Sequence, residues 1–112
     1  MAKVEIITSL KNEVLKKFKG QSVDVFRLMR SMADNPNKGK IVGYVTGMLI
    51  KELKYESFRF YFIVDGGKLK FFSQEELNDL LIKFVRMSDK KTQQKTIEEI
   101  KVILRSLGEE GF

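Results

Sequence analysis

The residues best suited to chemistry in this sequence are cations gathered near one tyrosine. Lys54, Arg59 and Tyr61 lie in a stretch of alternating apolar and polar residues, and Lys68 and Lys70 follow soon after. Lysine and arginine hold phosphate groups, and arginine does so through two parallel hydrogen bonds. Both also stabilise the negative charge that develops when a phosphodiester is attacked. A tyrosine can donate a proton or stack on a base, so this group of residues points to a polyanion.

Two residue types on which many sites depend are missing. The 112 residues include no histidine and no cysteine. The commonest general base and the commonest metal ligand are therefore absent, and neither a disulfide nor a thiolate metal site can form. Any catalysis must use lysine, arginine, tyrosine, aspartate or glutamate. Because the glycines also lack the spacing of a phosphate loop or a dinucleotide fingerprint, we expect no metal and no cofactor.

Net charge and length indicate which class of protein this is. Lysine and arginine exceed aspartate and glutamate by 21 to 15, which gives a net charge of +6 and suits RNA or another polyanion. No stretch approaches the ~20 apolar residues of a membrane span, and the N-terminus lacks a signal-peptide core. We therefore expect a cytoplasmic protein with no membrane contact. With 43% hydrophobic residues, including nine phenylalanines, residues 1–112 are expected to form a single domain.

Residues 47–72 are the element that must position the cations, and their pattern predicts three short strands joined by two tight turns. Alternation of apolar and polar residues from Phe58 onward has the period of a half-buried strand. A first turn at Glu56-Ser57 would place Lys54 opposite Arg59 and Glu52 opposite Tyr61.

A second turn, at Asp65-Gly66-Gly67, would lead into a third strand. One face would then be apolar, with Phe60, Phe62, Leu69 and Phe71. The opposite face would carry Arg59, Tyr61, Lys68 and Lys70. It is the candidate functional face, with an ordinary solvated sheet face as the alternative.

The flanking segments predict an α+β fold. A short strand over 3–8 precedes two amphipathic helices, the first ended by Gly20 and the second by residues 34–37, and residues 41–45 can be extended. Capping boxes at Ser73–Glu76 and Thr96–Glu99 introduce helical apolar stripes over 77–85 and 97–107, although 80–85 alone also fits a strand. We expect a small antiparallel sheet packed against an N-terminal helix pair and C-terminal helices. Arg86, Lys90 and Lys91 lie around the polar joint before the last helix.

The order of three short motifs resembles the RelE/HigB toxin superfamily, in particular its phage-derived HigB-like branch. The motifs are Glu52-Leu53-Lys54, then Phe58-Arg59-Phe60-Tyr61-Phe62, then the lysine-rich joint from Phe84 to Ile100. The resemblance covers residues 3–107 and implies a RelE-like fold. It also implies a metal-independent mRNA endoribonuclease that acts at the ribosome and is held in check by an antitoxin protein.

The resemblance also implies roles for individual residues. Arg59 matches the arginine of the aromatic-flanked strand and, with Arg86, would stabilise the phosphate charge. Lys54 would position the backbone or aid proton transfer. Tyr61, which no family motif places, would stack or donate a proton. The remaining cations would bind RNA: Lys68, Lys70, Lys90 and Lys91.

Three departures from the family pattern leave other functions open. Residues 73–80 look inserted, Ile97 stands where the branch often has proline, and there is no histidine or clear C-terminal tyrosine to act as an acid. The alternatives are a nucleic-acid-binding domain without cleavage activity and a protein-interaction module.

Overall fold

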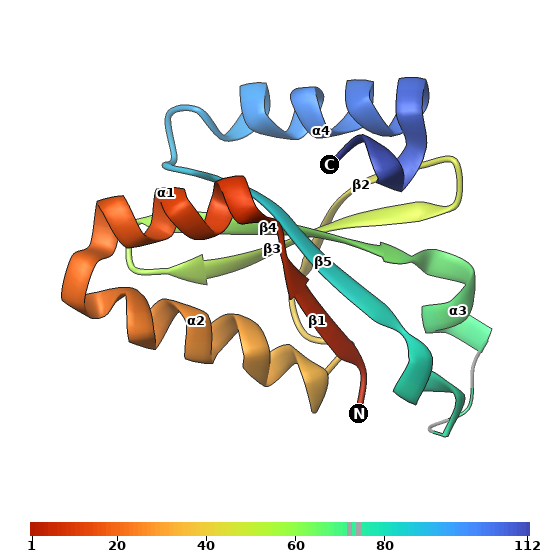
Figure 1. Ribbon diagram of the computed structural model, residues 1–112. Coiled ribbons are helices and arrows are strands. Elements are labelled where there is room, and N and C mark those ends of the chain that lie inside the picture. Colours follow the sequence, from red (N-terminus) through yellow and green to blue (C-terminus); the bar gives the residue numbers. More distant parts are fainter. Residues whose placement is uncertain (72, 74) are drawn as a thin grey trace.

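The computed structural model describes residues 1–71, 73 and 75–112, and they form an α+β fold around one five-stranded sheet (Figure 1). The strand order is β1-β5-β4-β3-β2. The strands are β1 (Lys3–Ile6), β2 (Lys40–Val45), β3 (Met48–Tyr55), β4 (Phe58–Asp65) and β5 (Leu81–Ser88). The α-helices are α1 (Thr8–Phe18), α2 (Ser22–Arg30), α3 (Gly66–Phe71) and α4 (Gln93–Leu107). Short 3-10 turns are η1 (Lys19–Gln21), η2 (Ser31–Ala33), η3 (Glu76–Asp79) and η4 (Gly108–Gly111).

The sheet is mixed, whereas the sequence predicted an antiparallel one. The first strand, β1, runs parallel to β5, and the other neighbouring pairs are antiparallel. The last strand of the chain, β5, therefore lies between the first strand and β4. Two parallel strands need a long connection, and here the part of the chain that carries α1 to α3 and β2 to β4 connects β1 to β5.

The β3–β4 hairpin has the predicted register. Lys54 pairs with Arg59 and Glu52 pairs with Tyr61, so both cross-strand predictions are confirmed. The turn between the strands places Glu56 at a positive φ of 54°. The alternation of side chains in this hairpin separates a face of phenylalanines from a face that carries the polar groups.

One apolar core lies between the sheet and the N-terminal helices. Leu10, Val14 and Phe18 of α1 pack with Val25 and Met29 of α2 against the phenylalanine face of the sheet. The Phe18 ring makes edge-on contacts with Tyr55 and Phe58, at centroid distances of 5.7 and 5.2 Å. These contacts fix the end of α1 beside the β3–β4 turn.

A second core lies on the opposite face of the sheet. Ile97, Ile100 and Leu104 of α4 are buried together with Ile50 and Tyr61 of the hairpin. In Figure 1, α4 runs along the top of the molecule while α2 lies below the sheet. The face that was expected to carry the functional cations is therefore largely covered by a helix.

The prediction of a third strand after Asp65 is wrong. Residues Gly66–Phe71 form α3, and the neighbour of β4 in the sheet is β5 instead. Residue 72, where the predicted strand ended, lies outside the described residues. The backbone N–H of Lys68 donates to the Asp65 carboxylate at 3.0 Å, a contact that stabilises the first turn of a helix.

The helix predicted over 77–85 is also wrong, because residues Leu81–Ser88 form β5. The capping box itself is present: the Ser73 N–H donates to the Glu76 carboxylate and the Glu76 N–H donates to the Ser73 hydroxyl, both at 3.3 Å. It precedes only the short turn η3. The chain then becomes extended at Leu80, so the sheet rather than the helix pattern decides the structure of this segment.

The last helix begins earlier than the capping box at Thr96 predicted. It starts at Gln93, and Gly108 ends it with a φ of 68°, as expected for a C-terminal glycine. None of the helices in the described part of the chain has the length and apolar character needed to cross a bilayer.

Candidate functional site

Three strands bring polar residues into one row at the end of the sheet. Lys54 on β3 pairs with Arg59 on β4, and Arg59 pairs with Ser88 on β5. Lys90 and Lys91 follow Ser88 and Asp89 in the joint that leads to α4, and both are exposed, as is Lys54. Four of the predicted cations therefore lie at the same end of the sheet.

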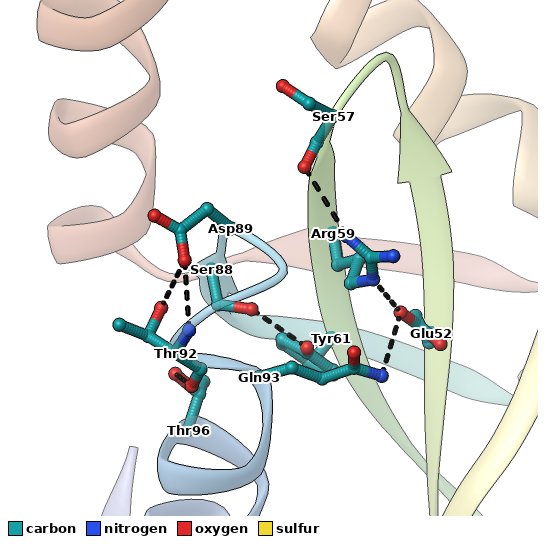
Figure 2. A network of polar contacts seen from close by, with 9 residues as sticks. All are labelled: Glu52, Ser57, Arg59, Tyr61, Ser88, Asp89, Thr92, Gln93 and Thr96. Atoms are coloured by element: carbon teal, nitrogen blue, oxygen red, sulfur yellow. Dashed lines mark hydrogen bonds and ion pairs between the residues drawn. The ribbon is translucent and has the colours of Figure 1, made fainter.

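Arg59 is held in place by its own chain. Its Nε lies 2.8 Å from Glu52 Oε1, and the two side chains are only 11% and 2% exposed. This contact is an ion pair and not a hydrogen bond, because the N–H bond does not point at an acceptor. Its Nη1 donates to the Ser57 carbonyl at 3.3 Å, and the Gln93 amide donates to Glu52 Oε1 at 3.4 Å (Figure 2). Among the described residues Nη2 of Arg59 has no hydrogen-bond partner, so its N–H groups can donate to a bound anion.

Tyr61 is an anchor of the second core and not a surface group. Its side chain is fully buried, and its hydroxyl lies 2.8 Å from the Ser88 hydroxyl. Burial raises the pKa of Tyr61, although the Ser88 hydrogen bond opposes the shift. A ring packed under α4 has no free face for a base, so this geometry does not suit the stacking role expected for Tyr61.

Arg86 pairs with Tyr61 on β4, diagonal to Arg59, and it is held by contacts of its own. Its Nε donates to Glu99 Oε1 at 2.8 Å, its Nη1 donates to the Val85 carbonyl at 2.7 Å, and its guanidinium lies over the Phe112 ring. Glu99 is six residues beyond Gln93 on α4, which is about 9 Å along the helix. Glu99, which holds Arg86, and Gln93, which holds the carboxylate partner of Arg59, therefore lie at different places on α4.

A second carboxyl lies close to the Arg86 pair. Burial raises the pKa of Glu13, and Glu99 raises it further while Arg86 lowers it. The surroundings of Arg86 are thus acidic on two sides, since α1 and α4 each contribute a glutamate. This setting favours a structural ion pair over a free phosphate ligand.

Lys68 and Lys70 do not join the other cations. The prediction that they share a face with Arg59 and Tyr61 is wrong, because they lie on α3. That helix follows Asp65, six residues beyond Arg59 along β4, or about 20 Å at the rise of a strand.

The joint before α4 is ordered by one aspartate. Asp89 Oδ1 accepts from the Thr92 N–H at 2.9 Å and from the Thr92 hydroxyl at 3.0 Å (Figure 2). The hydrogen bond from the Thr92 backbone lowers the pKa of Asp89. Lys90 and Lys91 are therefore displayed by a capped turn at the positive end of the helix dipole.

Three residues of the site were not among the predicted site residues. Glu52 lies in the same motif as Lys54, and its predicted place opposite Tyr61 already put it diagonal to Arg59, a distance that long side chains can span. Ser88 and Gln93 lie in the stretch that was predicted to be a polar joint, but Ser88 ends β5 opposite Arg59, and Gln93 begins α4 beside Glu52.

Comparison with known proteins adds no relative: a scan against protein-family models, a search of curated proteins and a search of solved structures all found no match. Within the described residues, no group of three or more acidic side chains is arranged to hold a metal ion.

Proposed function

We propose that this chain is a RelE/HigB-type endoribonuclease, the toxin of a toxin–antitoxin pair, which cuts mRNA at the ribosome. The observation that carries the proposal is the cross-strand pair of Lys54 and Arg59, set beside the lysines of the joint. The order of strand, two helices, sheet and final helix also agrees with the fold that the resemblance implies.

The residues suit attack by a ribose 2′-hydroxyl on the adjacent phosphate. The hydroxyl loses its proton, the new O–P bond forms, and the bond to the 5′-oxygen breaks as that oxygen takes up a proton. Arg59 would stabilise the extra charge on the phosphate through its unpartnered nitrogen. Lys54, exposed beside it, would position the backbone or transfer a proton.

Glu52 would act as a positioning residue in this scheme. It holds the arginine by Nε, while Gln93 holds the carboxylate in turn. A guanidinium fixed in this way loses less freedom when it binds a phosphate. Lys90 and Lys91 would follow the RNA backbone away from the reacting phosphate.

RNA binding without cleavage is a second candidate, and specific observations favour it. Both arginines are paired with carboxylates of the chain, and Tyr61 is buried. The surface that remains accessible is then a set of lysines with one partly available arginine, which is enough for electrostatic binding.

The two candidates separate in one experiment. A purified sample is incubated with 5′-labelled mRNA, either free in the presence of EDTA or on translating ribosomes in their own Mg²⁺ buffer, and both binding and product ends are measured. Cleavage should yield 2′,3′-cyclic phosphate and 5′-hydroxyl ends. Loss of one charge-stabilising donor in Arg59→Lys should lower the rate about 10²-fold.

Lys3→Ala is the matched control, because Lys3 is exposed and pairs with Leu81 at the far end of the sheet. Its rate should equal that of the wild type. RNA that is bound but never cut would favour the second candidate. Neither binding nor cleavage, on or off the ribosome, would exclude both.

A further inference from the structure

An apolar groove lies between β2 and α3, at the end of the molecule away from Arg59. Its volume is about 560 Å³, within the range of ligand sites in proteins. Its apolar lining consists of Ile41, Tyr44, Leu49, Leu69 and Phe71. Three of these side chains are largely exposed: Ile41, Tyr44 and Phe71. Leu49 and Leu69 also pack against the first core, so the floor of the groove is continuous with that core.

The groove borders a free strand edge. In the described sheet β2 is an end strand, paired only with β3, so one side of its backbone can hydrogen-bond to another chain. Its sequence carries a single charge, the exposed Lys40, and its other exposed side chains are those of Ile41 and Tyr44. Such an edge is suited to an added strand, in which backbone hydrogen bonds give affinity and side-chain pockets give selectivity.

Most charges around the groove are positive, and the exception is Asp65, whose carboxylate lies beside the lining residue Gly67 and accepts from the Lys68 N–H. Lys70 lines the groove, Lys68 is exposed on the same helix, and Lys38 is exposed next to the lining residue Asn37. Behind the wall, the nearly buried Lys51 donates from Nζ to the Asn37 carbonyl at 3.0 Å. No ion pair within the described residues includes Lys51, so its charge is uncompensated there.

We propose that the β2–α3 groove binds an extended segment of a separate protein, in which apolar residues alternate with aspartate or glutamate. The segment adds to the sheet beside β2, with apolar side chains over Tyr44 and Leu49 and carboxylates near Lys70. An apolar floor and a free strand edge suit a peptide better than RNA, which would need cations along its whole length. The proposal deepens the partner part of the proposed function, but it concerns a surface remote from the cleavage residues.

The test begins with a display library of random 12-residue peptides, selected on the wild-type protein and counter-selected on Tyr44→Ser. We expect enriched peptides to alternate apolar residues and to carry net negative charge. In titrations of the best peptide, Tyr44→Ser and Lys70→Glu should each weaken binding at least tenfold. Val102→Ser and Lys3→Glu are the controls and should change it less than twofold, since both positions are exposed elsewhere.

Hydrogen exchange tests the added strand, because bound peptide should slow exchange at β2 amides that do not pair with β3. A selection that yields no groove-dependent peptide, or only basic peptides, would overturn the proposal. A tenfold loss of RNA affinity in Tyr44→Ser would assign the groove to nucleic acid instead. These peptide-binding measurements do not depend on whether the protein cleaves RNA, so this proposal and the ribonuclease proposal can fail separately.

Discussion

Glu52 and Arg59 lie on neighbouring strands, two positions out of direct register, and their side chains meet at 2.8 Å in a nearly buried ion pair. The pair connects the β3–β4 hairpin to α4, because Gln93 donates to the same carboxylate oxygen. Removal of one partner leaves the other charge without compensation, which is costly in a buried setting.

Glu52→Leu should therefore lower the free energy of unfolding by about 3 kcal/mol. The double variant Glu52→Leu/Arg59→Leu should recover much of that loss, because no charge remains buried. Urea unfolding of the two single variants, the double variant and the wild type measures the coupling. A loss below about 0.5 kcal/mol in Glu52→Leu would show that the pair is solvated.

Tyr61→Phe should cost about 1–2 kcal/mol at neutral pH, because the buried Ser88 hydroxyl loses its partner. Burial raises the pKa of Tyr61 above its ordinary value of about 10, so the folded chain holds the phenol proton more tightly than the unfolded chain. The stability that the protonated Tyr61 phenol contributes to the folded state is fully present below about pH 10, and it is lost as the pH rises through the folded pKa.

The difference in stability between wild type and Tyr61→Phe should accordingly shrink above about pH 10. Unfolding by urea at a series of pH values measures it. Ser88→Ala, which removes the same hydrogen bond and leaves the phenol, is the companion variant. A difference that stays constant across this pH range would contradict the shift.

Lys51 should show the opposite dependence. Burial lowers the pKa of Lys51, so the folded chain gives up this proton more readily than the unfolded chain. The cost of burying the ammonium is present at neutral pH and is relieved as the pH rises toward about 10.5. Relative to Lys51→Met, the wild type should therefore gain stability over this range. Lys3→Met, at an exposed lysine, should show no such trend.

RNA affinity should depend on salt according to the number of phosphates held. If Lys54, Arg59, Lys90 and Lys91 each neutralise one phosphate of a single strand, the log–log slope should be about −2.8. Lys90→Ala/Lys91→Ala should reduce its magnitude by about 1.4, and Lys68→Ala should leave it unchanged because α3 lies at the other end of β4. A reduced slope in Lys68→Ala would show that RNA extends to α3.

The β3–β4 hairpin could be predicted because residues close together in the sequence determine its turn and its register. Alternation from Phe58 to Val64 and a two-residue turn at Glu56-Ser57 fixed which residues face one another, and the Lys54–Arg59 pair followed. The sequence could not reveal that α4 covers the same face, because the apolar stripe of a helix does not say which surface it packs on. Tyr61 was therefore placed on an accessible face although it is buried.

The segment over residues 77–85 was mispredicted because two patterns coincide there. Leu77, Leu80 and Phe84 have helical spacing, but Leu80, Ile82 and Phe84 also alternate, and it is these last three that are fully buried. Leu81, which a helix would have buried, is exposed. The strand wins because β1 and β4 together offer hydrogen bonds on both of its sides, a tertiary effect that no local pattern contains.

The position of β5 has a consequence for synthesis of the protein. β1 leaves the ribosome first, yet its partner in the sheet is 78 residues further along, since Lys3 pairs with Leu81. The β2–β3–β4 meander can form while the chain is still growing, whereas the first strand and the helices that follow it must wait for the buried side chains of β5. Pairing over such a separation is slow, so the nascent chain exposes the inner face of α1 and α2 until β5 has been made.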